Sequence, residues 1–286
     1  MSGALAERSG VLFVGSHART ARVMVFDLDG RPLDDSLAFR DEDRGRSSVS
    51  GLAVDADRRL WIADGEGRCL RTFSVFGQQV AQVPGGQADA RGSLGRPSGV
   101  AVRGTDDELV VAVASAGRRR HAVQLLSPAT GRSLSLRPLG DPEGRFEDVV
   151  GVELVEDEVW VLEAGRSRLQ VFRGGDFHYA VPLPELGDAR PSAFALAPGG
   201  RPVVAWEGER GAVLALDREG AIEGCLAAFG EDEGSVAYPT GLVCVPGEDD
   251  RHTRVVLLDR DGRRVQVFNL EGTCYGAFAR GEAGSA

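Results

Sequence analysis

Lysine is absent from this sequence of 286 residues: all 33 basic residues are arginine. Asparagine occurs once, as Asn269, and isoleucine twice, as Ile62 and Ile222. These three amino acids have AT-rich codons, so their scarcity indicates a GC-rich genome, and we expect a bacterial source. The abundance of arginine is then a consequence of base composition and does not indicate phosphate recognition.

Cysteine is scarce, and its spacing excludes two kinds of site. No two cysteines form a C-x-x-C pair, which excludes a zinc knuckle and a thioredoxin-like motif. No apolar run approaches the roughly 20 residues that span a bilayer. The first ten residues include Glu7 and Arg8 and lack the apolar core of a signal peptide. We therefore expect a cytoplasmic protein with free thiols and without membrane insertion. The cysteines are Cys69, Cys225, Cys244 and Cys274.

The charge balance is acidic, with a formal net charge of −10. Such a surface repels nucleic acids. Arg118, Arg119, Arg120 and His121 form the one dense basic cluster. Proteins that bind single strands also use aromatic platforms for base stacking, and this chain has only three tryptophans and three tyrosines. We expect no nucleic-acid partner, and RNA binding stays a minor alternative.

A short phrase recurs along the chain, in which a small residue is followed by alternating apolar positions. Proline precedes three of its copies, where it can open a strand without donating inside it. Each copy is followed by an apolar run, a third strand that ends in a bulky residue, and a fourth strand. A weaker copy, Gly3–Ala6, opens the chain. The five clear copies begin at Ser50, Ser98, Val150, Ser192 and Thr240.

Short strands in such repeats bury their faces when they stack radially. The sequence therefore predicts an all-β fold, a six-bladed β-propeller of four-stranded antiparallel blades in a single domain, 1–286. We expect Gly3–Ala6 to be the inner strand of the first blade, with closure by blade-to-blade packing. The alternative is an N-terminus that pairs with the last blade. The predicted blades span residues 3–38, 50–83, 98–137, 150–183, 192–228 and 240–279.

Three acidic or amide tetrapeptides that end in glycine occupy the same place in their repeats: 27–30, 217–220 and 269–272. Glycine supplies a left-handed position at little steric cost, which favours a hairpin turn. A calcium loop of the EF-hand type needs further oxygen ligands and a distant glutamate. The sequence therefore predicts turns here.

Residues 254–269, together with Leu60–Asp64 and Arg168–Phe172, resemble the NHL repeat, and the resemblance extends over most of the chain. It implies a six-bladed propeller. Related gluconolactonases hold a metal with asparagines, which a chain with one asparagine cannot supply. The similar peptidyl-glycine lyases use histidine-ligated zinc, whereas His17, His121, His178 and His252 fall in separate repeats. We expect no catalytic set, no metal and no cofactor.

An acid followed shortly by arginine recurs after the second strand of several repeats. Each acid could pair with its own arginine inside the loop, or the pairs could form a charged rim that docks a partner. Both can hold together. The candidate binding residues are Asp64 with Arg68, Glu163 with Arg166 or Arg168, Glu207 with Arg210, and Asp259 with Arg263.

Glu153 is an unusual residue for an inner strand. Its expected counterparts are Leu5, Ala53, Ala101, Ala195 and Val243. A carboxylate there either lines a hydrated central channel or contacts a ligand, because its unpaired burial is costly. Two tryptophans, Trp61 and Trp160, are expected in the core, while Trp206 could reach the rim.

The sequence favours a non-catalytic platform for protein–protein interaction, with a partner of unknown identity, as a subunit or accessory factor of a bacterial assembly. The alternative is a lyase or hydrolase that acts on a small molecule in the central channel, near Glu153.

Overall fold

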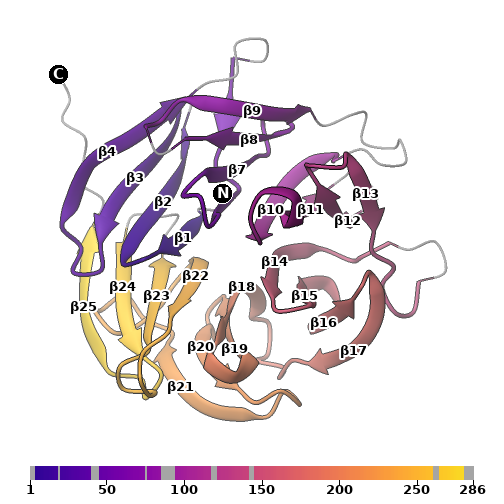
Figure 1. Ribbon diagram of the computed structural model, residues 1–286. Helices are drawn as coiled ribbons and strands as arrows, with labels where there is room; N and C mark the ends of the chain where they lie inside the picture. Colours follow the sequence, from indigo (N-terminus) through magenta and orange to yellow (C-terminus); the bar gives the residue numbers. More distant parts are fainter. Residues whose placement is uncertain are drawn as a thin grey trace.

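The computed structural model is a closed ring of six antiparallel blades around a central channel (Figure 1). It describes residues 4–18, 20–39, 45–74, 76–84, 94–116, 121–141, 145–259 and 264–279. Each blade has four strands in sequence order from the channel to the periphery. The predicted fold class is confirmed.

The first three blades contain strands β1 to β13. The first holds β1 (Leu5–Arg8), β2 (Val11–Ala18), β3 (Ala21–Asp27) and β4 (Pro32–Phe39), and β5 (Ser47–Ser48) pairs with β2. The second holds β6 (Gly51–Val54), β7 (Leu60–Asp64), β8 (Cys69–Phe73) and β9 (Gln79–Pro84). The third holds β10 (Arg96–Arg103), β11 (Val110–Ala116), β12 (His121–Ser127) and β13 (Arg132–Ser135).

The last three blades contain strands β14 to β25. The fourth holds β14 (Val149–Val155), β15 (Glu158–Glu163), β16 (Arg168–Arg173) and β17 (Asp176–Pro182). The fifth holds β18 (Arg190–Ala197), β19 (Arg201–Glu207), β20 (Ala212–Leu216) and β21 (Ile222–Ala228). The sixth holds β22 (Pro239–Val245), β23 (Arg254–Asp259), β24 (Arg264–Asn269) and β25 (Cys274–Ala279).

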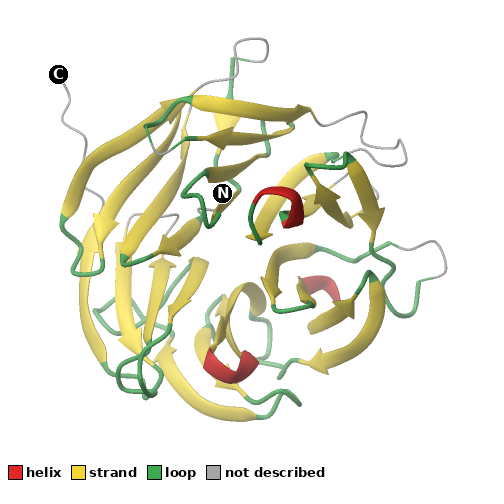
Figure 2. Ribbon diagram, viewed as in Figure 1, coloured by secondary structure: helices red, strands yellow, loops and turns green. Residues whose placement is uncertain are grey.

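Helical structure is limited, in the part of the chain that the structure describes, to three single turns of 3-10 helix (Figure 2). They are η1 (Asp106–Glu108), η2 (Ala164–Arg166) and η3 (Pro198–Gly200). Among the described residues, no helix is long and apolar enough to cross a lipid bilayer.

Apolar packing between neighbouring blades closes the ring. The buried residues form six clusters, each shared by two adjacent blades. At the seam, Leu12 and Val14 of the first blade pack with Val256 and Leu258 of the sixth. Because β1 pairs with β2 in its own blade, every blade is locally complete. The expected mode of closure is confirmed, with the inner strand at Leu5–Arg8 in place of the expected Gly3–Ala6, of which Gly3 lies outside the described residues.

The three predicted hairpin turns are formed as the sequence indicates. Gly30, Gly220 and Gly272 have positive φ angles of 82°, 93° and 85°. Asp27 Oδ1 accepts hydrogen bonds from the Asp29 and Arg31 amides at 3.0 and 2.8 Å. Because this carboxylate oxygen accepts hydrogen bonds from two backbone amides of the turn, Asp27 stabilises the turn in which it lies.

Two faces of the ring follow from the antiparallel order. Loops from second to third strands and crossovers from fourth strands to the next blade lie at the same end of each blade. We call this end the entry face. Loops from first to second and from third to fourth strands form the opposite face. The predicted acid–arginine pairs therefore belong to the entry face.

Candidate functional site

The entry-face acids occupy one register position at the end of the second strand, and only in alternate blades. Strand pairing aligns this position across blades, because Gly51 pairs with Ala63, Gly151 with Leu162 and Gly241 with Leu258. The next residue is a buried acid in the second, fourth and sixth blades. The equivalent residues around the ring are Ser16, Asp64, Ser115, Glu163, Trp206 and Asp259.

Asp64 ties together three segments of the second blade. Its Oδ1 accepts hydrogen bonds from the amides of Ser48 and Gly67, both at 2.8 Å. Its Oδ2 lies 3.0 Å from Nε of Arg71, which is almost fully buried on β8. The carboxylate thus fixes the incoming crossover and the β7–β8 loop. Its buried cation is Arg71, whereas the expected partner Arg68 is exposed at a positive φ of 52°.

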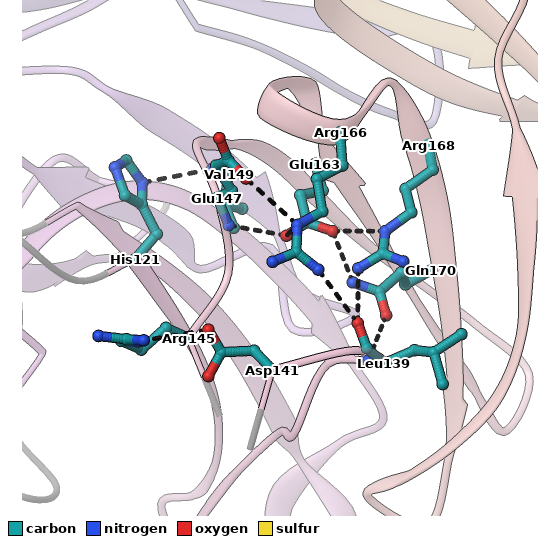
Figure 3. A network of polar contacts seen from close by, with 10 residues as sticks. All are labelled: His121, Leu139, Asp141, Arg145, Glu147, Val149, Glu163, Arg166, Arg168 and Gln170. Atoms are coloured by element: carbon teal, nitrogen blue, oxygen red, sulfur yellow. Dashed lines mark hydrogen bonds and ion pairs between the residues drawn. The ribbon is translucent and has the colours of Figure 1, made fainter. Parts of the chain in front are cut away.

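Glu163 performs the same task in the fourth blade (Figure 3). Its Oε1 accepts the Glu147 amide at 2.7 Å. Its Oε2 accepts Arg168 Nε at 2.6 Å and Gln170 Nε2 at 2.8 Å. Of the two arginines considered from the sequence, Arg168 makes the close contact. Arg166 Nε lies 3.9 Å from Glu163 and 3.2 Å from Glu147.

The crossover into the fourth blade is held by the same network. Gln170 Oε1 accepts the Leu139 amide at 2.9 Å, while Arg168 Nη2 donates to the Leu139 carbonyl at 2.8 Å. Figure 3 shows these side chains converging on one stretch of backbone. The loop is therefore anchored at both its donor and its acceptor groups.

Asp259 repeats the arrangement in the sixth blade. Its Oδ1 accepts the Tyr238 amide at 2.7 Å and the Ala237 amide at 3.2 Å. Arg264 Nη2 donates to its Oδ2 at 2.5 Å, and Gln266 Nε2 donates to the Ser235 carbonyl at 2.7 Å. The paired cation here is the half-buried Arg264; the expected partner, Arg263, lies outside the described residues.

Glu207 does not belong to this set, which corrects the sequence interpretation. The pairing of Pro191 with Trp206 gives Trp206 the position that Asp259 holds opposite Pro239. Glu207 is one residue further and only half-buried, and Arg210 is exposed. Trp206 is 1% exposed, so the expectation that it could reach the rim is wrong. Trp61 and Trp160 are buried, as predicted.

Exposed side chains surround the channel mouth on the entry face. Arg96 pairs with Glu66 of the preceding blade, and Arg190 pairs with Asp148. Tyr238, at the equivalent site before a strand-opening proline, is 57% exposed. The entry face thus carries two arginines at the starts of β10 and β18, two acids that pair with them, and one tyrosine.

The central channel encloses a cavity of about 270 Å³, lined by the inner strands of all six blades. Glu153 lies in this wall. Because Leu5 pairs with Val14, the register places Ala6, rather than Leu5, at the position equivalent to Glu153. The residues at this level are alanine in four blades, valine in the sixth and glutamate in the fourth: Ala6, Ala53, Ala101, Ala195, Val243 and Glu153.

Burial changes the acidity of Glu153. Its Oε2 accepts the Leu196 amide of the next blade at 3.2 Å. Removal from water raises the pKa of Glu153 from 4.5 to about 8, and the Leu196 hydrogen bond only partly opposes this. Burial also raises the pKa of the Cys244 thiol, with the Glu153 charge as a smaller cause. The raised pKa of the half-buried Glu153 favours its neutral form at pH 7.

The histidines do not assemble a metal site in the residues that can be described. His121 Nδ1 accepts the Val149 amide at 3.2 Å (Figure 3). Burial and the nearby Arg190 charge lower the pKa of His121, against an opposing effect of Glu163. No group of three or more potential metal ligands occurs among the described residues. Arg118, Arg119 and Arg120 lie outside them.

Apart from Arg168, which the sequence analysis offered as a partner of Glu163, the side-chain partners of the buried acids were not identified from the sequence. Arg71, Gln170 and Gln266 occupy one register position on the third strand of their blades. Polar residues between apolar neighbours, as in Leu169–Val171 and Val265–Val267, were the available signal. A glutamine between buried positions needs partners for its amide, which a count of strand spacing does not supply.

Comparison with known proteins identifies the fold. No protein-family model matches the chain, and no curated protein has a significantly similar sequence. The fold is similar to a streptogramin B lyase, with 13% identity, a TM-score of 0.61, and coverage of 98% of this chain and 83% of that one. A gluconolactonase from Xanthomonas campestris is 16% identical, with a TM-score of 0.63 and coverage of 94% of this chain and 84% of that one. A chain of the nidogen/laminin complex is 13% identical, with a TM-score of 0.65 and coverage of 95% of this chain and 94% of that one.

These similarities show a six-bladed β-propeller, a fold that both enzymes and binding proteins use. At such identities they carry no information on activity. The resemblance to NHL repeats stays a prediction, because no family model matches.

Proposed function

We propose that this chain is a non-catalytic binding propeller whose entry face docks a protein partner, as a cytoplasmic subunit or accessory factor of a bacterial assembly. One observation carries the proposal: in alternate blades a fully buried acid fixes the entry-face loops to the blade beneath. The acids concerned are Asp64, Glu163 and Asp259.

Rigid loops favour binding, because a partner then loses little affinity to the cost of ordering them. The side chains that the loops present are of the types that dominate the binding energy at interfaces, tyrosine and arginine. Arg68, Arg166, Arg210 and half-buried Glu207 could contact a partner directly. Asp64, Glu163 and Asp259 have no exposed surface, so their role is to position the loops of their own blades, including those that carry Arg68 and Arg166.

A pair of charge-reversed variants tests the proposal. Arg68 and Arg210 stand in the second and fifth blades, on opposite sides of the entry face, and both are exposed. The tagged double variant Arg68→Glu/Arg210→Glu is compared with Arg103→Glu/Arg132→Glu, in which two exposed arginines near the opposite face change. Both variants alter net charge equally, so bulk electrostatics is matched.

Capture from a lysate of the source cells, followed by mass spectrometry, gives the readout. We expect a stoichiometric partner with the unmodified chain and the control variant, and at least a tenfold loss with the entry-face variant. Equal capture by all three proteins, or loss with the control variant alone, would refute docking on the entry face.

A second function is favoured by Glu153: binding or conversion of a small molecule in the channel, for example by a lyase or hydrolase. A carboxyl group with a strongly raised pKa, set in a cavity, has the properties of a general acid or base. A screen for compounds that raise the melting temperature would test this. A hit whose effect survives in Glu153→Ala would count against a site at this residue.

A further inference from the structure

The channel cavity has an uneven charge distribution. Its lining, within the described residues, includes two ionisable side chains, Glu7 and Glu153, and no arginine or histidine. A cleft lined by one sign of charge focuses the field and concentrates ions of the opposite sign. When Glu153 is ionised, the cavity therefore favours a cation over an anion.

The two carboxyl groups differ in the use that the fold makes of them. Glu7 Oε1 accepts the Gly10 amide at 2.6 Å, which fixes the turn between β1 and β2. Glu153 accepts one longer hydrogen bond, from Leu196 at 3.2 Å through Oε2. An ionised carboxylate has about four acceptor sites, so Glu153 keeps unused capacity in a cavity.

The volume and the wall chemistry favour an organic cation. A cavity of about 270 Å³ has room for roughly nine waters at ~30 Å³ each, more than a bare ion needs. Its lining includes alanine and valine residues, among them Ala101, Val102 and Val243, together with the hydroxyl residues Ser50, Ser98, Ser192 and Thr240. A calcium ion requires six to eight oxygen ligands. The single carboxylate of Glu153 supplies at most two of them.

We propose that the channel binds a small organic ammonium ion, whose N–H groups donate to Glu153 and whose carbon chain lies along the alanine and valine wall. This inference rests on the channel as a ligand site, the second function above, and adds the chemical class of the ligand. It is independent of protein docking on the entry face.

Binding is then coupled to loss of a proton. The carboxyl group must ionise to accept the ammonium ion, and burial raises its pKa to about 8. Below pH 8 the ionised fraction of Glu153 increases about tenfold per pH unit. The affinity for the ammonium ion should therefore rise by the same factor. Primary ammonium groups stay charged in this range, with pKa values near that of lysine, about 10.4.

The groups around Glu153 do not duplicate this titration. Cys244 on β22 is held neutral by the raised pKa of its thiol. Arg201 on β19 is bound to Asp250 and Glu223, and its pKa is raised by the Asp250 hydrogen bond. Glu7 on β1 is engaged by its own turn. Trp160 faces Glu153 across the strand pair and does not titrate.

Calorimetric titration with n-butylammonium at pH 6, 7 and 8 tests the proposal, with 1-butanol and butyrate as neutral and anionic probes. The variant is Glu153→Gln, which keeps an oxygen for the Leu196 amide. The control is Glu156→Gln, an exposed acid in the β14–β15 turn outside the cavity. Should the glutamine variant fail to fold, Glu153→Ala introduces the residue of four other blades.

We expect saturable binding of butylammonium that tightens about tenfold from pH 6 to pH 7, is at least tenfold weaker in Glu153→Gln and persists in Glu156→Gln. Equal binding of butylammonium by Glu153→Gln overturns the proposal. So does tighter binding of butanol or butyrate, which would leave the channel as a site for another ligand class. Absence of binding by all three probes would overturn both the ammonium site and the channel function.

Discussion

Replacement of Glu153 by glutamine should remove a pH dependence from the stability of the whole fold. The pKa of Glu153 is about 8 in the folded chain and 4.5 when exposed. Between these values the folded protein keeps a proton that the unfolded chain has released. Stability from this residue is therefore fully present below pH 4.5 and is lost as the pH rises toward 8.

The size of the effect follows from the same two values. Their difference of about 3.5 corresponds to about 5 kcal/mol, at about 1.4 kcal/mol per pKa unit. Between pH 5 and pH 8 the unmodified protein should lose about 4 kcal/mol relative to Glu153→Gln, since the glutamine side chain does not titrate. Cys244, whose raised pKa depends partly on the Glu153 charge, keeps its proton between pH 5 and pH 8, so the other groups cancel in the comparison.

Urea denaturation at pH 5, 6, 7 and 8 measures this difference directly. The two free energies of unfolding should diverge steadily with pH, in favour of the variant at high pH. Parallel curves for the two proteins would refute the burial of Glu153 as a neutral acid. Divergence in the opposite sense would mean that an uncharacterised positive group pairs with it.

Two further substitutions test the packing that holds the loops and the channel. Asp64→Ala should cost about 3–5 kcal/mol in urea denaturation, because it removes the buried ion pair with Arg71 and the acceptor of two backbone amides. Half-buried Glu207→Ala should change stability by less than about 0.5 kcal/mol. Equal effects of the two substitutions would contradict the assigned register. Gly51→Ala should cost about 1–3 kcal/mol, because its Cβ would lie 2.7 Å from the Cα of Gly99. Gly99→Ala, whose Cβ would meet nothing nearer than 3.5 Å, should be neutral or slightly stabilising, and a larger loss than at Gly51 would show that the inner strands pack differently.

The fold could be predicted from the sequence because its signals are local and repeated. The small–apolar phrase marks each inner strand, and turns of the form Asp/Asn-x-x-Gly mark three of the outer hairpins. Neither depends on contacts between distant residues. Six repetitions of such signals leave few architectures that bury every apolar face.

The site was harder to predict, because it depends on register to one residue. A shift by one position moves a side chain to the other face of a strand. In the fifth blade Trp206 holds the position that a buried acid holds in the second, fourth and sixth blades. Glu207 is one residue further along the strand and therefore lies outside the buried set. The opening copy is displaced in the same way, which is why Ala6 and not Leu5 corresponds to Glu153.

Long-range partners were the second gap. Arg71 lies seven residues from Asp64 and contacts it, although the same sequence offers Arg68 closer by. Strand pairing decides between them. Spacing along the chain therefore indicated that an arginine would be present but not which one.

The proposal that the entry face docks a partner is tested most directly by hydrogen–deuterium exchange on the complex captured with the tagged chain. The account predicts added protection in the entry-face segments 64–68, 207–210 and 229–238, with unchanged exchange in the opposite-face turns 27–31 and 217–221. Protection confined to the opposite-face turns or the outer strands would contradict it.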